Sequence, residues 1–199
     1  MKKQIILIHG GQTYDSYEEY ISSLQVKVLD FERAQQKFWK DTFAERLGSD
    51  YEVIAPRMPN GHNAKYLEWK IWFDKYVPYL QDGAVLVGHS LGGIFLAKYL
   101  SENTFPCGIS ATILLAAPHD AEDLEDSLAD FVLPDSLALF EKQGGKIHLF
   151  QSKDDPVVRY EDVVAYKAQL SSASVIVFEN HGHFNIEEFP ELVELIKKL

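Results

Sequence analysis

Short apolar runs alternate with longer segments of helical spacing along this chain, and this alternation constrains its fold more than any other feature. The apolar runs lie at residues 4–8, 51–55, 84–88, 111–116, 146–151 and 174–178. Most are nearly continuous, as expected of strands buried on both faces of a parallel sheet. The helical segments lie at roughly residues 36–47, 65–80, 91–102, 136–143, 160–171 and 187–198. Strands that alternate with helices predict a three-layer α/β fold, with a doubly wound sheet of about six mostly parallel strands.

The length and the absence of a linker predict a single domain over residues 1–199. Single domains usually contain about 100 to 200 residues, and the sequence holds no fixed-period repeat and no Pro/Gly/Ser-rich stretch. Within the helix predicted at 65–80, Leu67, Ile71 and Trp72 recur at three- and four-residue intervals. We expect this stripe to face the core.

Two connections are longer than the simple alternation requires. Residues 12–35 follow the first predicted strand, and residues 118–135 follow the fourth. Connections of more than about 12 to 15 residues are often lids or pocket walls. Each could equally be a solvated excursion with short helices of its own, and the residues leave both interpretations open.

Charge and composition make several classes of function unexpected. The chain has 30 acidic and 19 basic residues, a formal charge of −11, and no concentrated basic patch. Such a charge repels phosphate backbones and anionic lipids, so we expect neither a nucleic-acid nor a membrane partner. No apolar run is long enough for a signal peptide or a membrane span, which predicts a cytoplasmic protein. Cys107 is the only cysteine, so no intramolecular disulfide can form, and we expect a buried or half-buried apolar role for it.

The most informative motif directly follows the third predicted strand. Gly88-His89-Ser90-Leu91-Gly92 fits the pattern Gly-x-Ser-x-Gly, and an apolar helix is predicted after it. Small residues two positions before and after the serine allow a sharp strand-to-helix turn that leaves the hydroxyl exposed. The motif alone is weak, but its place between a strand and a helix favours Ser90 as a nucleophile.

A serine nucleophile needs a base and a carboxylate that orients the base. His181 and His183 follow the last predicted strand, and Asp154 and Asp155 follow the fifth. Both pairs therefore lie at the edge of the sheet where the site is expected. The order Ser, Asp, His is the one expected in this architecture. We favour His183 over His181, because Gly182 lets the loop turn and the next residue, Phe184, can anchor the backbone in the core.

An oxyanion hole would require the N–H of Leu91 and a second N–H from the loop after the first strand. That loop reads His9-Gly10-Gly11-Gln12. We expect His9 to brace the strand end rather than take part in chemistry. The loop lacks Gly-x-Gly-x-x-Gly, and the chain contains neither Gly-x-x-x-x-Gly-Lys nor His-Glu-x-x-His.

Together, these motifs resemble the four signature regions of the α/β-hydrolase superfamily. They are His9-Gly10-Gly11, Gly88-His89-Ser90-Leu91-Gly92-Gly93, Asp155-Pro156-Val157-Val158 and Gly182-His183-Phe184. The small size, the late Asp-Asp-Pro and the Gly-His-Phe-Asn ending are most similar to the retinoblastoma-binding-protein-type serine hydrolases and their bacterial relatives. The resemblance implies a sheet without the first two strands of larger members, no separate cap domain, and Asp155 rather than Asp154 as the acid.

The resulting hypothesis is a serine hydrolase, carboxylesterase-like, that cleaves small acyl esters through an acyl-enzyme. Its catalytic residues would be Ser90, Asp155 and His183, with Gly11 and Leu91 at the oxyanion hole. No metal or organic cofactor is required, and the expected partner is a small-molecule acyl substrate. A scaffold that acts through a protein partner remains possible but is not indicated. Acyl transfer or peptide cleavage would use the same triad.

The segment from Asp120 to Asp135 interleaves carboxylates with apolar residues and suggests the kind of substrate. The carboxylates are Glu122, Asp123, Glu125, Asp126 and Asp130, and the apolar residues are Leu124, Leu128, Phe131, Val132 and Leu133. If the segment covers the serine, its apolar side can line an acyl pocket while the carboxylates disfavour anions. We therefore expect a preference for neutral, short-to-medium acyl esters.

Overall fold

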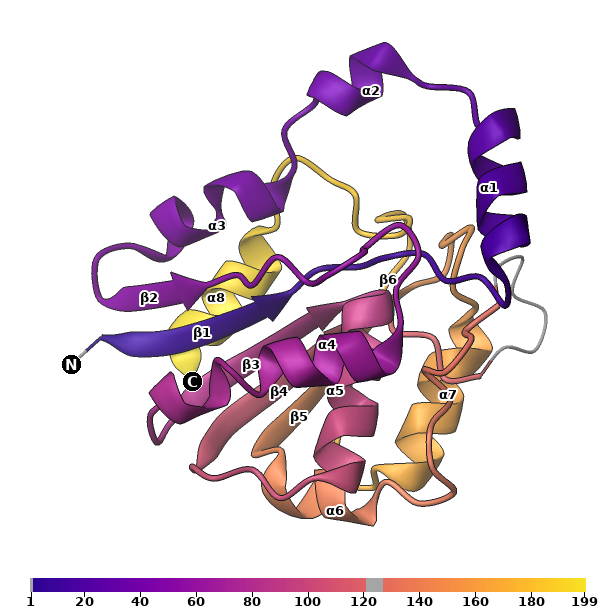
Figure 1. Cartoon of the computed structure of the whole chain (residues 1–199). Coiled ribbons are helices and arrows are strands. Elements are labelled where there is room, and N and C mark those ends of the chain that lie inside the picture. Colours follow the sequence, from indigo (N-terminus) through magenta and orange to yellow (C-terminus); the bar gives the residue numbers. More distant parts are fainter. Residues whose placement is uncertain (1, 121–126) are drawn as a thin grey trace.

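A six-stranded, wholly parallel sheet forms the centre of the computed structural model, which describes residues 2–120 and 127–199 (Figure 1). Its strands are β1 (Lys3–Ile8), β2 (Tyr51–Ile54), β3 (Ala84–His89), β4 (Ile109–Leu115), β5 (Lys146–Ser152) and β6 (Ser174–Phe178). They lie in the order β2-β1-β3-β4-β5-β6. The predicted strands and the three-layer, doubly wound architecture are confirmed.

Helices cover both faces of this sheet. They are α1 (Tyr17–Val26), α2 (Phe31–Gln35), α3 (Trp39–Leu47), α4 (Tyr66–Phe73), α5 (Leu91–Glu102), α6 (Ala138–Gln143), α7 (Tyr160–Gln169) and α8 (Pro190–Lys198), with a 3-10 turn at Val77–Tyr79. Buried residues of α3 and α8 share one core cluster, and those of α4 to α7 share the other. All six predicted helical segments contain a helix, although α3 and α8 begin about three residues later than expected. The segment predicted at 65–80 is helical only to Phe73, and the 3-10 turn at Val77–Tyr79 follows it.

The central strands explain why these runs are continuously apolar. In β1, Ile5 and Leu7 enter the core on the α3/α8 side, while Ile6 and Ile8 enter the core on the opposite side. Successive strand residues point to opposite faces, so a strand covered on both faces needs apolar residues at every position. The edge strands differ: in β6, Val175 and Val177 are more than a third exposed. Two-sided burial therefore holds for the inner strands and not for β6.

The predicted stripe of α4 is wrong. Leu67 and Ile71 are more than half exposed, and Trp72 is also exposed. The helix instead buries the aromatic stripe Tyr66, Trp69 and Phe73. Trp69 packs edge-on against Phe95 of α5 and against Phe131. Most residues of this helix are apolar, so its sequence is compatible with two different buried faces. The face with the larger aromatic rings is the one that fills the core.

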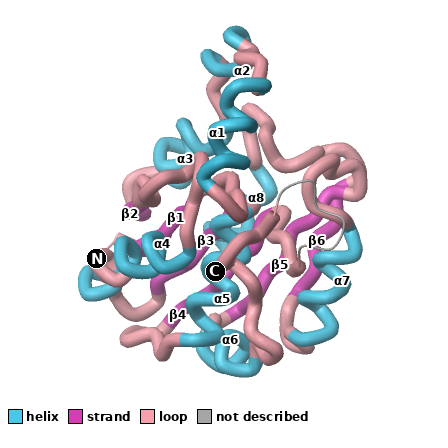
Figure 2. Tube along the Cα trace, turned by 45° about the vertical axis from the view of Figure 1, so that its right-hand side comes forward, coloured by secondary structure: helices cyan, strands magenta, loops and turns pink. Residues whose placement is uncertain are grey.

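The two long connections behave differently. In the first, α1 and α2 stand away from the sheet in both views, and α1 buries no residue (Figures 1 and 2). This favours the solvated excursion with short helices. In the second, residues 121–126, which include four of the predicted carboxylates and Leu124, lie outside the described residues. Beyond them, Leu128 and Phe131 are buried.

In the described part of the chain, no helix is both long enough and apolar enough to cross a bilayer.

Candidate active site

The turn between β3 and α5 is a strained elbow with Ser90 at its tip. Ser90 has φ 55° and ψ −124°, a left-handed conformation that residues with a side chain rarely adopt. The backbone is tightly packed on both sides of this serine: a Cβ on Gly88 would lie 2.4 Å from the carbonyl oxygen of Gly92. A Cβ on Gly92 would lie 2.4 Å from the carbonyl oxygen of Ile8 in β1. The sharp turn expected from Gly-x-Ser-x-Gly is thus present, with glycines where no side chain fits.

Two backbone amides flank this serine. Leu91 is the first residue of α5, and Gly11 follows β1, the neighbour of β3 in the sheet. Both residues line one cavity with Ser90. In the described part of the chain, neither N–H donates to another group, whereas Ser90 N–H donates to Leu115 O at 2.8 Å. Helix N-termini carry partial positive charge, so the amide of Leu91 is suited to an anionic oxygen.

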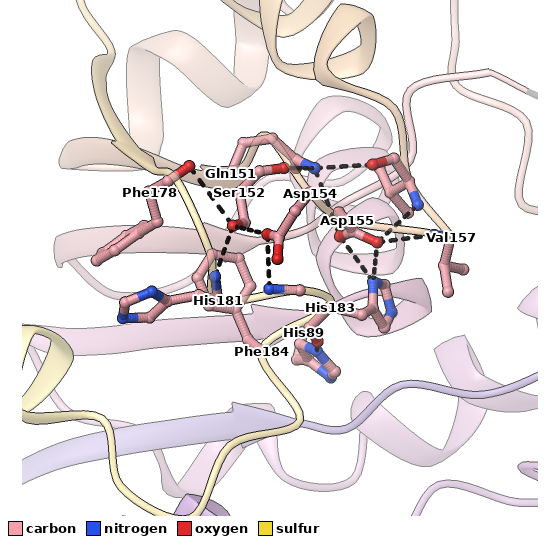
Figure 3. Close-up of polar contacts among 12 residues, drawn as sticks. His89, Gln151, Ser152, Asp154, Asp155, Val157, Phe178, His181, His183 and Phe184 are labelled. Atoms are coloured by element: carbon pink, nitrogen blue, oxygen red, sulfur yellow. Dashed lines mark hydrogen bonds and ion pairs between the residues drawn. The ribbon is translucent and has the colours of Figure 1, made fainter.

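His183 and Asp155 form a hydrogen-bonded pair at the same edge of the sheet (Figure 3). His183 Nδ1 lies 2.9 and 3.1 Å from the two carboxylate oxygens of Asp155. A carboxylate accepts, so Nδ1 donates, and in the neutral form of the ring this leaves the lone pair on Nε2. The Asp155 side chain is fully buried, and it also accepts from the N–H groups of Val157 and Val158. These bonds fix the carboxylate and, through it, the imidazole.

The other member of each sequence pair has a different environment. Asp154 is exposed, and its Oδ1 accepts from the Ser152 hydroxyl at 2.5 Å and from Gly182 N–H at 2.9 Å. These bonds lower its carboxyl pKa. His181 packs against Phe178 with ring centroids 4.3 Å apart and has no contact with Asp155. Asp154 therefore braces the histidine loop, and His181 belongs to an aromatic cluster (Figure 3).

Ser90 and Asp155 both line the cavity, which has a volume of about 230 Å³. Its walls include Leu91, Leu128 and Val157, so residues after the first, third, fourth and fifth strands converge there. Within the described residues, the Ser90 hydroxyl makes no hydrogen bond to His183, a contact that often tightens only with bound substrate. No group of three or more metal-ligating side chains gathers in residues 2–120 and 127–199.

His9 braces the end of β1, as expected. Its Nε2 accepts from Met58 N–H at 3.0 Å, its Nδ1 donates to Gly10 O at 2.5 Å, and its ring meets Trp69 edge-on. Burial lowers the pKa of the imidazole, which keeps Nε2 available as an acceptor. Cys107 is a half-buried free thiol.

Sequence reasoning missed a second histidine and a lysine at this edge. His89 is 3% exposed, and its Nδ1 lies 2.7 Å from Lys40 Nζ of α3. Its Nε2 lies 2.8 Å from the carbonyl oxygen of His183. Burial lowers the pKa of His89 well below its usual value and that of Lys40 to about 8. No spacing in the sequence signals this contact, because 49 residues separate the two side chains.

Comparisons with known proteins agree with this architecture. Rattus norvegicus serine hydrolase RBBP9 is 23% identical over 151 residues, which cover 75% of this chain and 78% of that protein. The Bacillus subtilis ydeN gene product superposes with a TM-score of 0.79 at 19% identity, covering 99% of this chain and 98% of the other. A structure from work on Nitrososphaera gargenis carboxylesterases has a TM-score of 0.62 at 15% identity, covering 99% and 89%.

These likenesses confirm the α/β-hydrolase fold and the resemblance to the retinoblastoma-binding-protein-type branch. The family model for serine hydrolases matches residues 27–198, nearly the whole chain. The match spans the elbow, the Asp155 turn and the histidine loop. The chain therefore belongs to the serine hydrolase family.

Proposed function

We propose that this hydrolase is carboxylesterase-like and cleaves small acyl esters, with Ser90 as nucleophile, His183 as general base and Asp155 as the orienting acid. The observation that carries the proposal is the buried Asp155–His183 pair at the cavity lined by the strained Ser90. A carboxylate held by two backbone amides and paired with an imidazole is an arrangement suited to orienting a base.

The reaction follows from the proton positions. His183 Nδ1 is committed to Asp155, so Nε2 takes the Ser90 proton as Oγ bonds to the acyl carbon. The carbonyl oxygen becomes an oxyanion, for which Gly11 and Leu91 supply N–H donors. His183 returns the proton to the leaving alcohol, and an acyl-enzyme remains. Water then attacks that ester with the same base, and breakage of the Oγ–acyl bond releases the acid and restores Ser90.

The cavity supports a small, largely neutral substrate. Its volume of about 230 Å³ lies below the range usual for drug-sized ligand pockets. Of the described lining residues, Arg159 alone carries a cationic side chain, and its guanidinium lies 3.7 Å from Asp120 and 4.0 Å from Asp162. Nearby carboxylates offset that charge. The carboxylesterase work behind one structural neighbour also points to esters.

A serine-directed fluorophosphonate tests the nucleophile. We expect it to label the wild type stoichiometrically at Ser90 and not to label Ser90→Ala, which should lose turnover about a million-fold if the triad acts as a unit. Ser101→Ala is the matched control, because Ser101 lies at the far end of α5 from the elbow. This variant should keep wild-type labelling and wild-type turnover. A Ser90→Ala variant that retains more than a tenth of wild-type turnover would remove Ser90 from the site.

A panel of matched acyl esters, amides, thioesters and aminoacyl esters tests the substrate class. We expect esters with short-to-medium neutral acyl groups to have the largest kcat/KM. Faster amide cleavage would indicate a peptidase, and transfer of the acyl group to an added alcohol or amine in preference to water would indicate an acyltransferase. A labelled protein without turnover on the whole panel would favour the scaffold that acts through a partner.

A further inference from the structure

We propose that Lys40 and His89 are positioning residues that hold the backbone of His183, so that the imidazole stays in line with both Asp155 and Ser90. This inference rests on the proposed role of His183. Lys40 Nζ contacts His89 Nδ1 at 2.7 Å, and His89 Nε2 contacts His183 O at 2.8 Å. The chain of contacts runs from α3 through the end of β3 to the loop after β6.

The proton positions in this chain are fixed by its two ends. The Lys40 ammonium has only protons to donate, so His89 Nδ1 accepts. The carbonyl oxygen of His183 can only accept, so His89 Nε2 must carry the ring proton and donate it. The contact therefore selects one tautomer of neutral His89. Without the Lys40 donor, Nδ1 could hold the proton, and the bond to His183 would be lost.

Neighbouring contacts fasten the same loop to α3. Trp39 Nε1 donates to Phe184 O at 2.9 Å, and Trp39 N–H donates to Ile186 O at 2.9 Å. Three carbonyls within four residues of the histidine loop are thus held by α3 directly or through His89. Asp155 holds only the imidazole of His183, from the opposite side. Both ends of the side chain are therefore constrained, its backbone by Lys40–His89 and its ring by Asp155.

The electrostatic setting supports a role other than charge pairing. Lys40 faces the neutral, buried His89, and its desolvation lowers its pKa despite the nearby Asp41 carboxylate. The other ionisable rings near His89 are His183, with centroids 5.0 Å apart, and His9. Burying a lysine amine without a hydrogen-bonded carboxylate costs free energy. The hydrogen bond from Lys40 to His89 therefore indicates a positioning role for this lysine.

The test compares Lys40→Met, which keeps the aliphatic stem but cannot donate, with Lys37→Met, an exposed lysine just before α3. We expect Lys40→Met to lower kcat about 10- to 100-fold, the loss that accompanies misplacement of a reacting group by about 1 Å, with KM within about twofold. The rate of fluorophosphonate labelling should fall by the same factor. Lys37→Met should match the wild type in both.

A nitrogen-15 spectrum of the imidazole rings reads the tautomer directly, without activity. We expect His89 protonated at Nε2 in the wild type and partly at Nδ1 in Lys40→Met. If Lys40→Met fails to fold, Lys40→Ala with added ethylamine replaces it, and recovery of kcat with amine concentration is the expected result. Normal kcat and an unchanged His89 tautomer in Lys40→Met would overturn this inference, while loss of labelling in Ser90→Ala would leave the proposed function standing. Unimpaired labelling of Ser90→Ala would instead overturn the proposed function.

Discussion

The connections after β1 and β3 leave neighbouring strands at the same edge of the sheet, yet they differ in both length and packing. The connection after β3 is the elbow, a turn of one residue, Ser90, between strand and helix. A Cβ on Gly88 or Gly92 would meet backbone atoms at 2.4 Å, and a Cβ on Gly93 would meet the Ala117 side chain at 2.5 Å. The connection after β1 contains the arm, defined as residues 17–35 with α1 and α2, whose apolar side chains Val28, Leu29 and Phe31 are mostly exposed. At the elbow, packing leaves no space and only glycine fits at these positions. In the arm, these apolar side chains are mostly exposed, so packing does not restrict their type.

The two histidines after β6 give the largest expected difference at this edge. His183→Ala should lose turnover about as severely as Ser90→Ala, on the order of a million-fold, because the hydroxyl then has no base. His181→Ala should keep turnover within about tenfold, since its ring meets Phe178 and not Asp155. Steady-state kinetics on folded variants measure both. An inactive His181→Ala beside an active His183→Ala would reverse the assignment.

The second-largest difference in turnover is expected between substitutions of the two carboxylates after β5. Asp155→Asn should lower kcat about ten-thousand-fold, because an amide in place of the carboxylate favours the wrong imidazole tautomer. Asp154→Asn should cost far less, since Asp154 bonds to Ser152 and Gly182 N–H but not to the imidazole. Pre-steady-state acylation rates separate the two. A larger loss in Asp154→Asn would make Asp154 the acid.

Substitution of an elbow glycine tests whether the backbone there leaves room for a side chain. Gly92→Ala places a methyl 2.4 Å from Ile8 O and 2.6 Å from His9 O, so β1 and α5 must separate. We expect a loss of about 3 kcal/mol in the free energy of unfolding. Gly108→Ala is the control, because its Cβ would meet only Asp82 Oδ1 at an ordinary 3.5 Å. Equal urea midpoints for the two variants would show that the elbow tolerates a side chain.

Much of this could be predicted from the sequence, and what escaped prediction has a common physical reason. The strands, the elbow and the His183–Asp155 edge follow from local requirements that leave a pattern, such as two-sided burial of β1 or the glycines around Ser90. The buried face of α4 and the Lys40–His89 contact do not. Both depend on which distant element packs against the residue, and the local sequence pattern does not reveal that packing partner.

Substrate charge should have a smaller effect, a few-fold in kcat/KM. The formal charge of −11 and the carboxylates beside Arg159 oppose anions, and screening weakens this beyond about 8 Å at physiological salt. A neutral ester should therefore exceed a matched anionic ester at low salt, and the gap should narrow at high salt. Of the carboxylates predicted to disfavour anions, Asp130 is the one within the described residues, and it accepts from Tyr66 N–H. Faster cleavage of the anion, or equal constants at both salt levels, would leave only the apolar pocket.

The smallest effect on stability is expected in the arm. The same Leu→Ala substitution, made in the arm and in the core, shows the effect of packing with the residue type held constant. Leu29 is 74% exposed and Leu100 of α5 is fully buried, so the same change deletes the same atoms in two environments. Leu29→Ala should alter the free energy of unfolding by no more than about 0.5 kcal/mol, whereas Leu100→Ala should cost about 2 to 5 kcal/mol through lost burial and a cavity. Urea unfolding of both variants at one protein concentration measures the difference. Because no described residue of the arm belongs to either core cluster, kcat should also be unchanged in Leu29→Ala. A loss above about 1 kcal/mol there would mean that the arm packs on the body in solution, and the contrast between the two connections would then be one of sequence pattern and not of packing.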